Sequence, residues 1–564
     1  MNCNQDVHKF THKDLLLRKL TYAVTCSVVS QIVILILYIV AVNSNIFHPW
    51  EWLMLSGKTL ISFSTLIFLI PFLAIIFAQS MICAKDYVIK SSYCSTRFQK
   101  FVVTFSMRNW VLLLLHIIVG ALLIWLMLSI SGGRHQNLIQ ACNGNRVCLN
   151  ESSFFLISSG LWTGLYFFIK VYIAEKNLTF PVIQQRKLLQ FTSQLRLLLR
   201  ESILLSFWPA LYFSILYYIR GEEFSSGFRH LFNFFPSQEH PAAYIYVELW
   251  YFSALYYFTM NLMRFFFNLF LTEPVEFPLL KEQSGSLTLQ ESIVNFDLPI
   301  VQNLACLDLH LLAEFSSTRR QVFFTLSQPG GHPHNWNSLL ENILKLIAEY
   351  TELLNKAFDV PEMAGIKSPT VPTPMAPSDR FRNLRNMALI NSQDYDFISV
   401  TKSPVRVAFP EPLIGKIAQK LNSIWSIIKT ILRINFLFGE LPQANIRRCL
   451  ANGQIIIWCS QGIADIVSAS IAEDRYGIVQ KDLPIIITSL VGLKQSLDKL
   501  NKVPALARKV AGYDDFNCKM KGAVTAAVKR SLFNICRTFG NYLQDMSLPK
   551  DVLQYLQFHI VCKS

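Results

Sequence analysis

The chain of 564 residues is rich in hydrophobic side chains, which make up 52% of it, whereas charged residues account for only 16%. Ordinary soluble domains carry about a quarter charged residues. This composition excludes an intrinsically disordered chain, a collagen-like repeat and a small disulfide-rich scaffold. Long uncharged runs are confined to the part before about residue 272. We therefore expect an all-α protein in which a membrane half precedes a mainly helical half.

Six stretches are long and apolar enough to cross a hydrocarbon core, which takes about 20 helical residues. After a tail at residues 1–19, the predicted spans cover residues 20–42, 60–82, 110–130, 154–173, 203–219 and 244–271. Pro71 and Pro209 fall inside spans, where packed neighbours can satisfy the freed backbone groups. The first span is too long for a cleavable signal peptide and lacks a small-residue cleavage site.

The basic residues predict how the spans are oriented. The N-terminal tail and the loops after the second and fourth spans hold 14 Lys and Arg, whereas the alternate loops hold 5. Because positive loops favour the cytosolic side, we expect both termini there. The same loops suit anionic lipid headgroups. The formal net charge of +15 does not predict direct nucleic-acid binding, since no zinc-finger, homeodomain or RNA-recognition pattern accompanies it.

The loop between the third and fourth spans is expected to face the lumen and holds two cysteines. Cys142 and Cys148 lie in CNGNRVC, where a disulfide between them would close a small hairpin; two free thiols are the alternative. The loop ends at a glycosylation sequon, Asn150-Glu151-Ser152, that almost touches the fourth span and is expected to be poorly modified. The sequon at Asn177 should be silent because it faces the cytosol.

Ionisable residues inside spans are functional candidates by default, and the membrane half holds three. Glu248 and Arg264 stand about 24 Å apart on one helix, too far to pair, and both reach headgroups. His116 is deeper, where it is either a packing residue or part of a pathway. A transporter or channel of the endoplasmic reticulum or nuclear envelope is therefore the alternative function, although the sequence has no inverted repeat to support it.

The second half is predicted to be helical on both sides of a Pro-rich linker. The helical parts are residues 272–359 and 381–564, and the linker at 360–380 suits phosphorylation or docking. One helix is expected at residues 304–324, and a second begins after Asn335 or Asn337, either of which could be its N-cap. Further helices are expected at about residues 443–470, 484–500, 520–543 and 550–561. Residues 454–472 are apolar, but we do not count them as a seventh span because polar residues interrupt them.

A basic amphipathic helix is predicted at residues 412–438, because Pro412 suits the first turn of a helix and Gly439 suits the position just after its end. Such a helix can lie on a membrane or pack against its neighbours. Its apolar side carries Ile417, Leu421, Ile424 and Ile428, and its basic side carries Lys416, Lys420, Lys429 and Arg433.

Motifs of enzymes are missing from the sequence. It contains no G-x-x-x-x-G-K-[ST], G-x-S-x-G or H-E-x-x-H pattern, so we expect no catalytic site and no cofactor. His332 and His334 flank Pro333, but no cysteine or carboxylate stands near them in the chain. We interpret this segment as a rigid turn between two helices, not as a metal site.

One segment carries a family resemblance. Residues 308–336 read DLHLLAEFSSTRRQVFFTLSQPGGHPHNW and resemble the signature of the multi-pass transmembrane nucleoporins called the nuclear division cycle protein one family. The tail segment at residues 529–543 is similar to the C-terminal helix of that family. The matching motif residues are Arg319, Arg320, Phe324, Leu326, Ser327, Gln328, Pro329, Gly330, Gly331, His332, Pro333, His334, Asn335 and Trp336.

The resemblance implies a membrane anchor of the nuclear pore complex, located where the inner and outer nuclear membranes meet. It implies a role in pore assembly, and as partners the lipids of the pore membrane and the inner-ring scaffold nucleoporins. Further implied partners are an amphipathic-helix nucleoporin with an RNA-recognition-like fold and the WD-repeat nucleoporin Aladin. Whether the chain also pairs with a second copy of itself is left open. The motif turn would then have a structural or partner-binding role.

Overall fold

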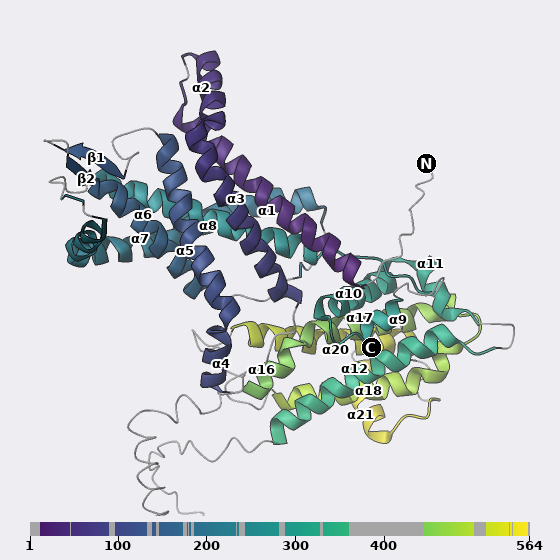
Figure 1. Ribbon diagram of the computed structural model, residues 1–564. Coiled ribbons are helices and arrows are strands. Elements are labelled where there is room, and N and C mark those ends of the chain that lie inside the picture. The colour runs from purple at the N-terminus through teal and green to yellow at the C-terminus, as the bar shows by residue number, and fades with distance from the viewer. Residues whose placement is uncertain are drawn as a thin grey trace, which may run out of the picture.

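The computed structural model consists of a bundle of long helices joined to a second helical domain, and Figure 1 shows the two side by side. The all-α prediction is confirmed, including the helical second half. The structure describes residues 12–45, 47–88, 96–131, 138–142, 146–172, 178, 180–181, 185–232, 234–235, 243–280, 288–326, 331–359, 444–500, 515–540, 542–543 and 545–561. The predicted linker at 360–380 and the predicted amphipathic helix at 412–438 lie outside these residues.

Six long helices form the bundle, and two short helices, α2 (Pro49–Ile61) and α4 (Arg97–Thr104), connect them. The long helix α7 has 46 residues and is about 69 Å long, more than twice the thickness of a hydrocarbon core. The predicted fifth span at 203–219 is therefore only its middle part. The long helices are α1 (His12–Val42), α3 (Phe63–Val88), α5 (Met107–Ser131), α6 (Glu151–Phe167) continued by the π-helix η1 (Phe168–Tyr172), α7 (Lys187–Phe232) and α8 (Ala243–Leu271).

In the described part of the chain, six helices are long and apolar enough to cross a membrane. Five of them, α1, α3, α5, α6 with η1, and α7, coincide with the first five predicted spans. The sixth predicted span forms α8, which carries Glu248, Asn261, Arg264 and Asn268 among its apolar residues. α8 packs against α1, α6 and α7, and it buries Tyr256, Tyr257 and Met260 almost completely. Because α8 turns these faces to other helices and not to lipid, it does not need a uniformly apolar surface.

The remaining apolar helix is α17 (Gly453–Glu473), in the stretch that we did not count as a span. It is the most buried of the six, since 61% of its apolar window lies inside the structure. It packs between α10 (Pro299–Phe315) and α20 (Asp515–Phe539) of the second domain. Its apolar character is explained by burial in a protein core, and we treat it as the central helix of that domain.

The contact between α5 and α6 depends on three glycines. A Cβ atom on Gly120 would lie 2.2 Å from the carbonyl oxygen of Gly160, and one on Gly164 would lie 2.3 Å from that of His116. Gly160 and Gly164 have the G-x-x-x-G spacing that lets two membrane helices approach through their backbones. This close approach places α6 in the middle of the bundle, next to α5, α7 and α8.

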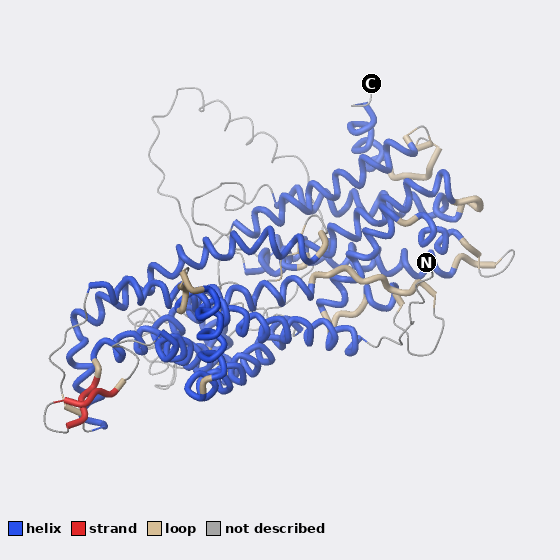
Figure 2. Tube along the Cα trace, turned by 90° about the horizontal axis from the view of Figure 1, so that it is seen from above, coloured by secondary structure: helices blue, strands red, loops and turns tan. Residues whose placement is uncertain are grey.

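A β-hairpin precedes α6 at the end of the bundle that is remote from the second domain, as Figure 2 shows. Its strands are β1 (Ile139–Cys142) and β2 (Arg146–Leu149), paired antiparallel with Cys142 opposite Arg146. Cys148 is disulfide-bonded, whereas the side chain of Cys142 is not among those described, so the Cys142–Cys148 pairing stays a prediction. Asn150 is buried, and its side chain caps α6 by accepting a bond from the Ser153 N–H. Because only 3% of Asn150 is exposed, its amide nitrogen has no room for a glycan in this structure.

The second domain arranges its helices around α17. α12 (His334–Asp359) packs against α18 (Ile478–Leu500), and α20 contacts both α17 and α18. The single helix expected at residues 304–324 is wrong, because α10 ends at Phe315 and the chain turns. The other elements are α9 (Leu289–Ile293), α11 (Ser317–Arg320), the 3-10 helix η2 (Gln321–Phe324), α16 (Ala444–Ala451) and α21 (Lys550–Val561).

The close contact between the backbones of α5 and α6 predicts that a larger residue at this contact lowers the stability of the protein. Gly160→Ala should destabilise the detergent-solubilised protein by about 1–3 kcal/mol, because the new methyl group overlaps the Gly120 carbonyl and neither backbone can move away cheaply. Gly227→Ala is the matched control, since a Cβ atom there meets nothing within 4 Å. Thermal unfolding followed by size-exclusion chromatography measures both. Equal midpoints for the two variants would contradict the close contact.

Candidate functional site

The chain leaves the bundle at a point where three membrane helices meet. Lys19 of α1 donates hydrogen bonds to the carbonyl oxygens of Phe270 and Glu273 at 3.1 and 2.7 Å. The carboxylate of Glu273 also binds Lys187 of α7 at 2.7 Å. The beginning of α1 and the end of α8 therefore lie together, at the end of the bundle that faces the second domain (Figure 1).

The next contact joins this exit to the second domain. The guanidinium of Arg319 donates to both carboxylate oxygens of Asp308 at 2.7 and 2.9 Å, and to the carbonyl oxygen of Phe277 at 2.8 Å. The N–H of Phe277 donates to Asp308 at 2.9 Å. We call Phe277, Asp308 and Arg319 the Asp308 junction. It connects three separate pieces of chain, namely the segment after α8, the middle of α10, and α11.

Burial determines the electrostatics of this junction. Only 3% of the Asp308 side chain is exposed. Burial raises the pKa of this carboxyl above its ordinary value, and the hydrogen bonds and charge of Arg319 partly offset that rise. A buried carboxylate without its partner is strongly unfavourable, so Arg319 is required wherever Asp308 is ionised.

The neighbouring arginine makes a second contact of the same kind. Arg320 donates to the two carboxylate oxygens of Glu473 at 2.6 and 3.1 Å, and to the carbonyl oxygen of Ala313 at 2.8 Å. The Ser317 hydroxyl donates to Glu473 at 3.0 Å. These bonds attach α11 to the last residue of α17. The two arginines thus hold the turn after α10 from opposite sides, and this explains why the predicted long helix ends at Phe315.

The aromatic residues of the motif lie in the core. Phe324, at the end of η2, is 4% exposed. Trp336 is fully buried, and its indole N–H donates to the Asp482 carboxylate at 2.9 Å, which joins α12 to α18. A buried indole nearly always finds such a partner. Both residues therefore stabilise the domain and are not available to bind a partner.

The segment predicted as a rigid turn joins η2 to α12, and most of it is not described, so its rigidity stays a prediction. Ser327, Gln328, Pro329 and Gly330 lie outside the described residues, whereas the exposed His332 and His334 follow at the surface. The cap predicted at Asn335 or Asn337 is wrong, because α12 already begins at His334 and the Asn337 N–H donates to the Pro333 carbonyl. Among the described residues, no group of three or more His, Cys, Asp or Glu is placed to hold a metal ion.

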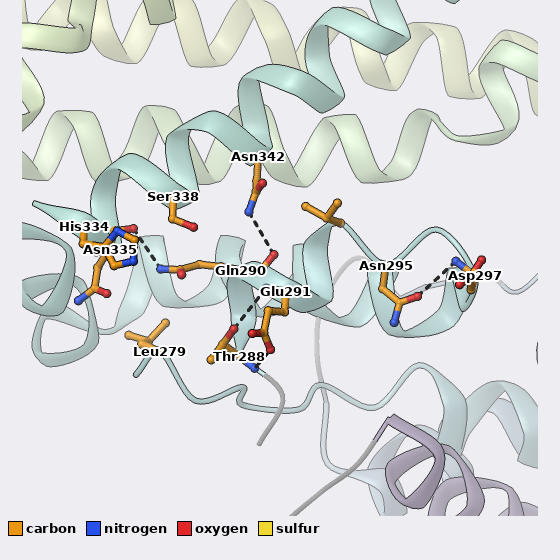
Figure 3. Close-up of a pocket in the computed structure, with 11 residues that line it drawn as sticks. Leu279, Thr288, Gln290, Glu291, Asn295, Asp297, His334, Asn335, Ser338 and Asn342 are labelled. Atoms are coloured by element: carbon orange, nitrogen blue, oxygen red, sulfur yellow. Dashed lines mark hydrogen bonds between the residues drawn. The ribbon is translucent and has the colours of Figure 1, made fainter. Parts of the chain in front are cut away.

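A pocket of about 840 Å³ lies beside this turn, between α9 and α12 (Figure 3). Most of the residues that line it have polar side chains. The Gln290 amide donates to the carbonyl oxygen of Asn335 at 3.1 Å, and Asn342 donates back to the carbonyl of Gln290 at 3.3 Å. Thr288 and Glu291 form a capping box at the start of α9. The pocket offers hydrogen-bonding groups to a polar chain and lies next to the exposed histidines of the motif.

Of the residues that line this pocket, the sequence singled out only His334 and Asn335, as members of the family motif. The Thr288-x-x-Glu291 spacing is a signal that marks the start of α9. Asp308 stands at the start of the segment that carries the family resemblance, whereas Glu473 and Asp482 carry no local signal that pairs them with it.

The intramembrane histidine sits in a packed environment. His116 is fully buried, and its Nε2 atom lies 2.9 Å from the Gln79 amide nitrogen while Nδ1 lies 2.8 Å from the Leu112 carbonyl. Its ring contacts Phe167, Phe168 and Tyr172. Both ring nitrogens thus have partners, and the packing interpretation accounts for this residue.

Comparisons with known proteins agree with this architecture over nearly the whole chain. The model of the family described as Nucleoporin protein Ndc1-Nup matches residues 14–557. The chain belongs to this nucleoporin family. Nucleoporin Ndc1 of Drosophila melanogaster is 26% identical to the chain, with 98% of each protein covered. Nucleoporin NDC1 of Mus musculus and of Homo sapiens are 25% and 24% identical, and each comparison covers 97% of this chain and 98% of the relative.

Membership of the Ndc1 family and the long apolar helices together make the chain a membrane protein of the nuclear pore. The relatives are named as nucleoporins, which are structural proteins and not enzymes. The resemblance that the motif at residues 308–336 suggested is therefore confirmed.

Arg319→Ala tests the Asp308 junction. The substitution leaves a buried carboxylate without its countercharge and should destabilise the second domain by about 3–5 kcal/mol. Adding Asp308→Asn should recover part of this loss, because the buried charge is then gone. Thermal unfolding of the full-length protein in detergent measures both. Lys356→Ala, which breaks an exposed pair with Glu352 on α12, is the control and should leave the midpoint unchanged.

The Arg320–Glu473 contact predicts a pH dependence. Hydrogen bonds from Arg320 and Ser317 hold the pKa of Glu473 below its ordinary value. Its stabilising contribution is complete above the pKa of an unfolded glutamate, about 4.3, and is lost as pH falls through the lower folded pKa. The difference in unfolding midpoint between wild type and Glu473→Gln should therefore narrow between about pH 5 and about pH 3. A difference that stays constant over this interval would be the contrary result.

Proposed function

We propose that this protein anchors the nuclear pore scaffold to the pore membrane and supports the assembly of pores into the nuclear envelope. The Asp308 junction is the observation that carries the proposal. It joins the segment after α8 to α10 and α11 through four hydrogen bonds around one buried carboxylate. A membrane bundle that is rigidly connected to a helical domain can hold that domain at a fixed place beside the bilayer.

The proposed orientation places both termini on the cytosolic or pore side. The start of α1 and the end of α8 lie together through Lys19 and Glu273, as expected when the number of crossings is even. The excess of Lys and Arg on this side, 14 against 5, supports the same orientation. The second domain would then face the pore scaffold.

The proposed partners follow from the family and from what the second domain exposes. They are inner-ring scaffold nucleoporins, an amphipathic-helix nucleoporin with an RNA-recognition-like fold, Aladin and a second copy of the chain. The motif residues Arg319, Arg320 and Trp336 are used for internal contacts. The polar pocket between α9 and α12 is instead the surface that we propose for a partner.

Depletion and rescue in cells test this function. Removing the cell's own member of the family should lower the number of nuclear pores per area of envelope. The wild-type chain should locate to the nuclear rim and restore this pore density. Pore density is counted by super-resolution imaging of a scaffold nucleoporin. A chain that spreads through the endoplasmic reticulum and leaves pore density unchanged would overturn the proposal.

A further inference from the structure

The short helix α4 is firmly attached to the start of α5. Thr96 caps its first turn, since the hydroxyl accepts a hydrogen bond from the Gln99 N–H at 3.1 Å. The buried side-chain amide of Asn109, on α5, donates to the carbonyl oxygens of Val103 and Thr104 at 3.1 and 2.8 Å. The last carbonyls of α4 are therefore satisfied from α5, and this contact sets the angle between the two helices.

A continuous row of exposed aromatic rings runs over this joint. The ring centroids of Phe101 and Phe105 are 4.3 Å apart, and those of Phe105 and Trp110 are 5.6 Å apart. The three side chains are 54%, 46% and 45% exposed, and Val102 beside them is 51% exposed. At about 100° per residue, Phe101, Val102 and Phe105 lie within one arc of the helix, and Lys100 projects from the opposite side.

The row continues into the lipid-facing surface of α5. Trp110, Leu114 and Ile118 are spaced by four residues and are 45%, 55% and 42% exposed, so they form one stripe on that helix. α5 is among the helices apolar enough to cross a membrane, and its exposed stripe therefore faces acyl chains. Trp110 is at the end of the stripe, where aromatic residues usually mark the boundary between acyl chains and headgroups.

Among the described helices, none packs along α4. In Figure 1 the helix lies at the end of the bundle that faces the second domain. Solvent exposure of three neighbouring large apolar side chains is unfavourable, by about 25 cal/mol for each Å² of apolar surface. The continuity with the α5 stripe indicates which surface covers them.

We propose that α4 lies in the headgroup region of the leaflet next to the second domain, with Phe101, Val102 and Phe105 inserted among the acyl chains. Lys100 then reaches the phosphate groups of the same leaflet. This inference rests on the proposed function to the extent that the bundle must span the bilayer. The inference adds a lipid-binding element whose position is fixed relative to the membrane bundle, because Asn109 holds α4 against α5.

Photo-cross-linking of the full-length protein in liposomes of phosphatidylcholine and phosphatidylserine tests this inference. Benzoylphenylalanine is placed at position 101, at position 99, which is about 160° around α4 from Phe101, or at position 114 on the α5 stripe. Mass spectrometry then measures lipid adducts after irradiation, on protein that elutes as a single species. Positions 101 and 114 should form lipid adducts at similar levels, at least about fivefold above position 99.

The three positions separate the inference from the function on which it rests. Lipid adducts at position 114 without adducts at 101 would overturn the interfacial position of α4 and leave the membrane bundle intact. Adducts from position 101 to another part of the chain would also overturn the inference. Absence of lipid adducts at position 114 would overturn both, because α5 would then not face lipid.

Discussion

The carboxylate of Asp308 is buried in the wall of the second domain, and the rest of the architecture depends on how its charge is balanced. Its neutralising partner, Arg319, is 11 residues further along the chain, and its backbone donor, Phe277, is 31 residues back. Because an unpaired buried charge costs several kcal/mol, these three segments must meet for the domain to be stable. That single requirement connects the exit of the last membrane helix to the core of the second domain.

The two halves reach rigidity by different means. In the membrane half, lipid is as apolar as the helices, so the bundle relies on close backbone approach at Gly120, Gly160 and Gly164. In the second half, α17 is surrounded by helices, and buried apolar surface supplies the stability. Arg320 and Glu473 attach the turn after α10 to this core helix. Lys19 and Lys187 in turn bind Glu273 and attach the segment after α8 to the bundle.

Much of the fold could be predicted from the sequence, because about 20 uncharged residues leave few alternatives to a membrane helix. The end of α10 could not. The apolar pattern continues through Val322 and Phe324, and the break at Ser316 results from contacts of Arg319 and Arg320 with partners as far as 153 residues away. Trp336 was identified from the motif, but its role depends on Asp482, which no local pattern connects to it. The sequence did separate α8 from α17, because polar residues interrupt the apolar stretch at 454–472, and the neighbours of each helix explain why both are nevertheless rich in apolar residues.

The central claim is that the membrane bundle holds the helical domain beside the scaffold of the nuclear pore. Proximity labelling with an enzyme fused to the C-terminus, in intact cells and at native expression level, tests it most directly. The account predicts that the biotinylated proteins are dominated by scaffold nucleoporins at the nuclear rim. Enrichment of transport proteins of the endoplasmic reticulum, with nucleoporins at background level, would contradict it.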